Sequence, residues 1–172
     1  MMKQFAAIAA TAALALSAPA LAQAPSDAQI AHIAYTAGQI DVAAGRQALQ
    51  RSHNRQVRAF AQTMVRDHEA VNRQAVALVT RLHVTPAANP TSVSLSSQAA
   101  ATLRRLATLR GAAFDRAYVQ NEVAFHRTVN AALRDTLIPS AQNAELKSLL
   151  QSGLALFTEH QTHAEHLASQ VR

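Results

Sequence analysis

Cysteine is absent from the 172-residue chain. Its absence excludes disulfide bonds, thiolate metal sites and a cysteine nucleophile. Only four glycines and five prolines occur, and no long run of Val, Ile and Thr alternates with polar residues, so we expect helices and no sheet. Tryptophan is missing and aromatic residues are rare, which leaves aliphatic side chains to fill the core. We therefore predict an all-α protein, long enough for one domain with its own core.

Acidic residues are also scarce, and the formal net charge is +6 with neutral histidines. The arginines are scattered singly along the chain and form no Lys/Arg block. A solvated basic surface explains this pattern better than a nucleic-acid site does. We expect no nucleic-acid partner, whereas a homo-oligomer and a protein partner both stay open.

Residues 1–22 have the pattern of a secretory signal peptide. Lys3 precedes an apolar, Ala-rich run from Phe5 to Leu21, and Ala20-Leu-Ala22 supplies the small residues of a cleavage site. The run is short for a membrane span and no stop-transfer charges follow it. We predict cleavage after Ala22, a single mature domain at 23–172 without a transmembrane segment, and a periplasmic or secreted location.

Helical periodicity predicts four long helices and one short one. Ser26, Asn54 and Asn143 are expected to cap three of them, because Asn and Ser side chains accept backbone N–H bonds at a helix start. The predicted long helices cover about 27–51, 55–83, 113–137 and 144–171. The crossover is predicted to contain a loop at 85–94, a shorter helix at 95–109 and Gly111. Pro139 is expected to end the long helix at 113–137. The fold class that follows is a ferritin-like four-helix bundle with an extra helix in its crossover.

Each long helix carries an ionisable residue near the middle of its apolar stripe. His68, for example, interrupts a stripe of seven apolar positions between Val57 and Leu82. The full set is Asp41, His68, Glu122, His126, His160 and His163. Counting along the helices from the first turn, Asp41 and His68 differ in height by roughly 4–5 Å. Glu122 and His160 are level when counted from the second turn, but the crossover hides how the two pairs align.

Inward carboxylates and imidazoles from facing helices are how bundles build metal sites. We predict that His68, His126 and His160 converge, that Asp41 or Glu122 adds a carboxylate, and that His163 is a reserve ligand. Such donors suit one divalent transition metal, either Zn, Fe, Cu or Mn. The alternative is that these histidines are structural and hydrogen-bonded in the core.

Several phrases resemble the exported bacterial family called domain of unknown function 4142. They are Asp41-Val-Ala-Ala-Gly45, Val57-Arg-Ala-Phe-Ala-Gln-Thr-Met-Val-Arg-Asp-His68 and Gly111-Ala-Ala-Phe-Asp-Arg-Ala-Tyr118, followed by His126 and His160. The resemblance extends over about Asp27 to Leu167. It implies export and a ferritin-like bundle, and some members are labelled outer membrane proteins. It implies no function.

Three functions compete at this point. The first is a periplasmic metal-binding bundle with one His-rich site. The second is a non-enzymatic envelope or stress protein that acts through its surface. The third is a di-iron oxidoreductase, which ranks lower because Glu-x-x-His is absent: Glu122 and His126 are four residues apart, as are Glu159 and His163. We assign no catalytic residue, because no nucleophile set or phosphate-binding loop occurs.

Overall fold

The computed structural model describes residues 24–171, and within this range the regular structure is entirely helical. The predicted signal segment lies outside the described residues. The elements are α1 (Asp27–Arg51), α2 (Arg55–Arg81), α3 (Pro90–Ala107), α4 (Gly111–Ala132), the π-helical turn η1 (Leu133–Leu137), α5 (Ile138–Ser140) and α6 (Ala144–Gln170).

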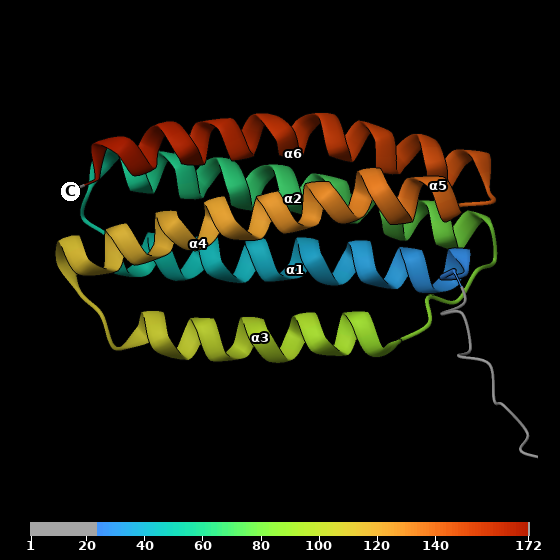
Figure 1. Cartoon of the computed structure of the whole chain (residues 1–172), viewed down its shortest axis with the longest axis horizontal. Coiled ribbons are helices and arrows are strands. Elements are labelled where there is room, and N and C mark those ends of the chain that lie inside the picture. Colours follow the sequence, from blue (N-terminus) through green and yellow to red (C-terminus); the bar gives the residue numbers. More distant parts are fainter. Residues whose placement is uncertain (1–23, 172) are drawn as a thin grey trace, which may run out of the picture.

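Helices α1, α2, α4 and α6 form a four-helix bundle (Figure 1). The antiparallel pair α1 and α2 packs against the antiparallel pair α4 and α6, with α2 next to α6 and α1 next to α4. Helix α3 runs back along the outside of α1, so α4 starts at the same end of the bundle as α2 (Figure 1). The predicted bundle with a helical crossover is confirmed.

Predicted caps start three of the four bundle helices, α1, α2 and α6. The Ser26 side chain and Gln29 form a capping box at α1. The Asn54 side chain accepts the backbone N–H groups of Gln56 and Val57 at α2. Asn143 does the same at α6. These short polar side chains accept hydrogen bonds from backbone N–H groups that have no partner within the first turn of a helix. The tight turns before α2 and α6 therefore end where the sequence predicts.

Helix α3 begins at Pro90, inside the segment that we predicted to be a loop. Asn89 accepts the backbone N–H of Ser92, and the Ser92 hydroxyl accepts the backbone N–H of Asn89. Proline is well suited to the first helical position, since its missing N–H would be unpaired there and its φ is already helical. The polar composition of residues 85–94 therefore contains a cap as well as a loop.

The end of the α4 region also differs from the prediction. The helix does not stop before Pro139 but passes through η1 and continues to Ser140. The ring of Pro139 would clash with the carbonyl four residues earlier in an ordinary α-helix. In η1 the backbone hydrogen bonds reach one residue further, as from the Ile138 N–H to the Leu133 carbonyl. The wider turn lets the helix continue past proline.

The core consists of two apolar clusters with a polar layer between them. One cluster surrounds Phe60, Met64 and Tyr118, near the junction of α1 and α2. The other surrounds Ile30, Leu133 and Leu146, near the opposite end of the bundle. The buried histidines and carboxylates predicted as ligands lie between these clusters on all four bundle helices.

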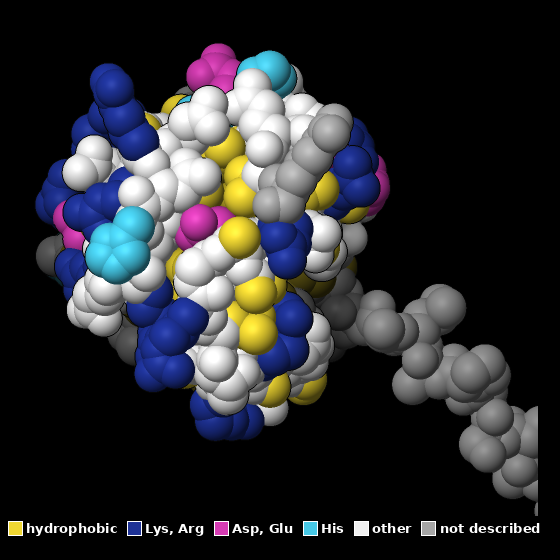
Figure 2. All heavy atoms as spheres, turned by 90° about the vertical axis from the view of Figure 1, so that its left-hand side faces the viewer, with side chains coloured by type: hydrophobic (Ala, Val, Ile, Leu, Met, Phe, Trp, Pro, Cys, Tyr) yellow, Lys and Arg dark blue, Asp and Glu magenta, His cyan; other side chains and the backbone are white. Residues whose placement is uncertain are grey.

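The outer surface carries scattered basic side chains. At the end of the bundle where α1 stops and α2 starts, arginine side chains are spread around the rim and do not form one continuous patch (Figure 2). Among residues 24–171, no helix combines the length and the apolar character that a bilayer crossing requires.

Candidate metal centre

His68, His126 and His160 meet at the centre of the bundle, one each from α2, α4 and α6. The ring centroids are 5.6 Å apart for His68 and His126, 5.3 Å for His68 and His160, and 5.7 Å for His126 and His160. One ring nitrogen from each lies within 4.8 Å of the other two. All three residues are at most 3% exposed. The structure thus brings together the three histidines that the sequence singled out.

Two of the three rings are each held by a hydrogen bond at one ring nitrogen, while the other ring nitrogen is left unpaired among the described residues. His126 Nδ1 lies 3.0 Å from the Glu122 carbonyl oxygen. His160 Nε2 lies 3.0 Å from Asp67 Oδ2. Both oxygens only accept, so Nδ1 of His126 and Nε2 of His160 must carry the protons. The lone pairs of His126 Nε2 and His160 Nδ1 are therefore free for a ligand, which is how proteins orient metal-binding imidazoles.

The free nitrogens have no hydrogen-bond partner among the described residues. His126 Nε2, His160 Nδ1 and both ring nitrogens of His68 are buried and unpaired. Leaving a buried polar group without a partner costs about 1–3 kcal/mol. Four such atoms in one small volume are unusual in a folded protein and need an explanation.

Two carboxylates extend the cluster toward α1 and α4. Asp41 Oδ2 lies 3.5 Å from His68 Nε2, and Glu122 Oε2 lies 3.9 Å from His126 Nδ1. Asp41, Glu122 and His126 form a second group whose candidate ligand atoms all lie within 4.8 Å of one another. Glu122 is 0% exposed and Asp41 is 2% exposed. All four bundle helices therefore contribute to one continuous polar site.

Burial keeps the three imidazoles neutral at neutral pH. It lowers the pKa of His126 to about 4. It lowers the pKa of His68 well below its ordinary value, with a further contribution from His126 and His160. The pKa of His160 is lowered by burial as well, against the opposing effect of Asp67. Since a metal binds only the unprotonated ring, these histidines are prepared to coordinate one.

Burial acts in the opposite direction on the carboxyl groups. It raises the pKa of Glu122 to about 7. It raises the pKa of Asp41 well above its ordinary value, and the neighbouring Glu122 adds to the rise. Without a cation, two adjacent buried carboxylates repel each other and retain a proton. A divalent ion would reverse this preference and expel that proton.

Asp67 is a contributor that the sequence analysis missed. It follows Arg66, which donates to both of its carboxylate oxygens at 2.7 and 3.1 Å. The hydrogen bond from Arg66 lowers the pKa of Asp67, so it stays ionised and accepts from His160. Asp67 precedes His68 by one residue and lies off the apolar stripe of α2, so periodicity alone gave no signal for it.

Phe157 is the second missed contributor. Its ring stacks on the His68 ring with centroids 4.5 Å apart and planes 13° from parallel. Phe157 is more buried than its neighbour Leu156. The position three residues before His160 would have indicated the correct face.

The structure does not bring His163 into the cluster. His163 is exposed, and its ring packs edge-on against Phe60, with centroids 5.1 Å apart. Ala164, four residues after His160, occupies the buried position of the next turn instead. The placement of His163 on the buried stripe was therefore wrong, because the buried face of α6 runs through Phe157, His160 and Ala164, and His163 lies on the other side of His160 from Phe157 and Ala164.

The ligand set fits one metal ion better than two. Three imidazoles and one or two carboxylates match the donors that zinc, copper and mononuclear iron accept. A ferritin-type di-iron site uses a carboxylate from each helix and two histidines. Among the described residues, the cluster offers two inward carboxylates, Asp41 and Glu122.

Comparisons with known proteins agree with the fold. A DUF305 protein from Streptomyces coelicolor that is proposed to be secreted superposes with a TM-score of 0.72 and 14% sequence identity, over 84% of this chain and 92% of its own. At this identity the likeness concerns the fold alone. No curated protein matches the chain. The profile of the domain of unknown function DUF4142 matches residues 10–167. The chain therefore belongs to the DUF4142 family.

Proposed function

We propose that the protein binds one divalent transition metal ion at the centre of its bundle. His68, His126 and His160 supply nitrogen ligands, and Asp41 or Glu122 supplies a carboxylate oxygen. The observation that carries the proposal is the set of converging, unpaired imidazole nitrogens in the buried core, two of whose rings are anchored at the opposite nitrogen. Nitrogen-rich donors favour copper and zinc over manganese.

The alternative of purely structural histidines accounts for less of the geometry. A structural core histidine finds a hydrogen-bond partner for its ring nitrogens. Asp41 Oδ2 lies 3.5 Å from His68 Nε2, but no hydrogen bond of His68 is formed with residues 24–171. A metal ion satisfies His68, His126 and His160 together, and it neutralises the adjacent carboxylates.

We also propose that the protein performs this role outside the cytoplasm. The predicted signal peptide at 1–22 supports export, and the DUF305 structural neighbour is itself proposed to be secreted. Binding and retention of a metal ion, without catalysis, is the function that these features support best. We propose no enzymatic reaction.

The test is metal titration of untagged protein stripped with a chelator. Zn²⁺ and Cu²⁺ should bind with a stoichiometry near one per chain and raise the melting temperature. A ligand that binds only the folded state stabilises it by about 2.7 kcal/mol at a hundredfold excess over Kd. His68→Ala should abolish the shift, and the matched variant His53→Ala, at an exposed turn position, should retain it. If Zn, Cu, Fe and Mn ions all leave the wild-type melting curve unchanged, the histidines are structural and hydrated.

A further inference from the structure

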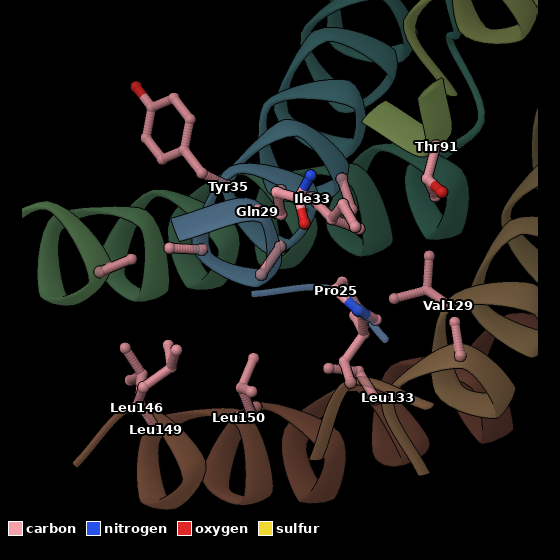
Figure 3. A pocket seen from close by; sticks show the side chains of 18 of the residues that line it. Pro25, Gln29, Ile33, Tyr35, Thr91, Val129, Leu133, Leu146, Leu149 and Leu150 are labelled. Carbon is pink, nitrogen blue, oxygen red and sulfur yellow. The ribbon is translucent and has the colours of Figure 1, made fainter. Parts of the chain in front are cut away.

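An apolar cavity of about 550 Å³ is lined by residues of α1, α2, α4 and α6, together with residues of α3 and η1. Leu146, Leu149 and Leu150 point from α6 into this space, and Ile33 and Leu133 line it from other elements (Figure 3). Tyr35 points away from it (Figure 3). The inner end is formed by Phe157 and Asn72.

Small side chains create the space. Ala34 and Ala37 on α1 line the cavity, and so does Gly153 on α6. Protein interiors are otherwise close-packed, with few voids larger than a water molecule. Apolar cavities of even about 150 Å³ stay dry and bind apolar molecules. A volume of 550 Å³ lies within the range of about 300–1,000 Å³ that is typical of small-molecule sites.

The chemistry of the lining limits what can occupy the cavity. None of the described residues that line it carries a charge. A carboxylate or phosphate inside would therefore be desolvated without a partner, which is costly. The polar residues at the solvent-exposed edge of the cavity are neutral, and they include Thr91 and Thr136. Their hydroxyl groups can hydrogen-bond a neutral polar group at that edge.

We propose that this cavity binds a neutral amphiphile with a single alkyl chain, such as a long-chain alcohol or a monoacylglycerol. The chain lies along the leucines of α6 and the alanines of α1, and its uncharged polar end lies near Thr91 and Thr136. This ligand site goes beyond metal binding and does not depend on it. The lining offers no cation that could pair with the carboxylate of a fatty acid or the phosphate of a phospholipid, so an uncharged amphiphile suits it better.

The test uses metal-free protein, so that its result is independent of the metal proposal. The uncharged probe N-phenyl-1-naphthylamine should gain fluorescence on binding, and 1-dodecanol should displace it with one molecule bound per chain by native mass spectrometry. Dodecanoate, with the same chain and a charged end, should bind at least tenfold more weakly. Failure of dodecanol to displace the probe, or equal affinity for dodecanoate, would overturn the proposal.

Variants locate the site. Ala34→Phe should fill the cavity from α1 and weaken dodecanol binding at least tenfold, whereas Ala43→Phe, at an exposed position on the same helix, should not. Leu149→Trp should have the same effect from the opposite wall, which covers the case in which Ala34→Phe does not fold. Circular dichroism checks helicity. Two well-folded cavity variants with wild-type affinity for dodecanol would contradict the proposal. A wild-type dimer that Ala34→Phe dissociates would also contradict it, because a second copy of the chain would then cover the cavity.

Discussion

His68 differs from the other two histidines because a stacked ring, and no hydrogen bond, determines its orientation. Phe157 packs on its face, while both ring nitrogens remain unpaired among the described residues. His126 and His160 are each held through one nitrogen. The three histidines are therefore positioned by three different contacts: an aromatic ring, a backbone carbonyl and a side-chain carboxylate.

Asp67 should matter for metal affinity although it does not reach the proposed ion. Asp67→Asn removes the negative charge that accepts from His160 Nε2. Loss of such an outer partner typically lowers metal affinity about 10–100-fold, and competition with a chelator can measure the change. Asp135→Asn is a matched control, because exposed Asp135 also pairs with the arginine just before it. Equal zinc affinity in wild type and Asp67→Asn would show that His160 needs no such orientation.

Glu122 should make the metal-free protein less stable as pH rises. Its pKa is raised from 4.5 to about 7 in the folded protein, so the folded state retains the proton longer than the unfolded chain does. The stability that this group contributes is fully present below its ordinary pKa and is lost as pH rises through about 7.

Glu122→Gln removes this titration while nearly preserving side-chain size. Relative to the variant, metal-free wild type should lose unfolding free energy as the pH rises from 4.5 to above 7, because burial raises the pKa of Glu122. Urea unfolding of both proteins at several pH values measures the difference. Glu159→Gln, on the exposed side of α6, is the control. A pH-independent difference between wild type and Glu122→Gln would show that Glu122 has no raised pKa.

At the scale of the elements, α1 and α2 pack closely at Gly45. A Cβ atom added at Gly45 would lie 2.9 Å from Val65 Cγ2 and 3.1 Å from the Ala61 carbonyl oxygen. The second contact is with backbone, so α2 itself would have to move. A Cβ at Gly153 would lie 3.4 Å from the ring of Phe157, which is ordinary contact.

These two glycines should respond oppositely to alanine. Gly45→Ala should lower stability by about 1–3 kcal/mol, the usual cost of overpacking. Gly153→Ala should raise it by up to about 1 kcal/mol through better helix propensity. Urea midpoints at unchanged slope provide the comparison. Stabilisation by Gly45→Ala would mean that α1 and α2 are packed less closely than described.

The elements whose boundaries depend on local chemistry were predictable from sequence. Ser26, Asn54 and Asn143 cap their helices as expected. The start of α3 was not predictable, because the cap formed by Asn89 and Ser92 lies within a polar segment that also fits a loop. Nor was η1, because Pro139 predicts a helix end, and only the packed structure shows that a wider turn lets the helix continue.

At the scale of the whole molecule, periodicity identified five of the residues that meet in the core. Asp41, His68, Glu122, His126 and His160 all face inward. The relative height of the two helix pairs was not predictable, because the crossover through α3 sets it by tertiary packing. Asp67 was missed for a related reason: its role depends on α6 lying next to α2, which no pattern within one helix can show.

Phe157 contacts both proposed binding sites, since its ring stacks on His68 and its side chain also lines the apolar cavity. A molecule bound in the cavity restricts the motion of the Phe157 ring. Metal binding at His68 then costs less conformational entropy, because this ring is already ordered. The two occupancies should therefore be cooperative, and thermodynamic reciprocity requires each ligand to tighten the other by the same factor. Dodecanol should lower the zinc Kd at least about fivefold, the low end of measured coupling. Zinc should lower the dodecanol Kd equally, and Phe157→Leu should reduce both effects. Identical zinc affinity with and without dodecanol would mean that the two sites bind their ligands independently.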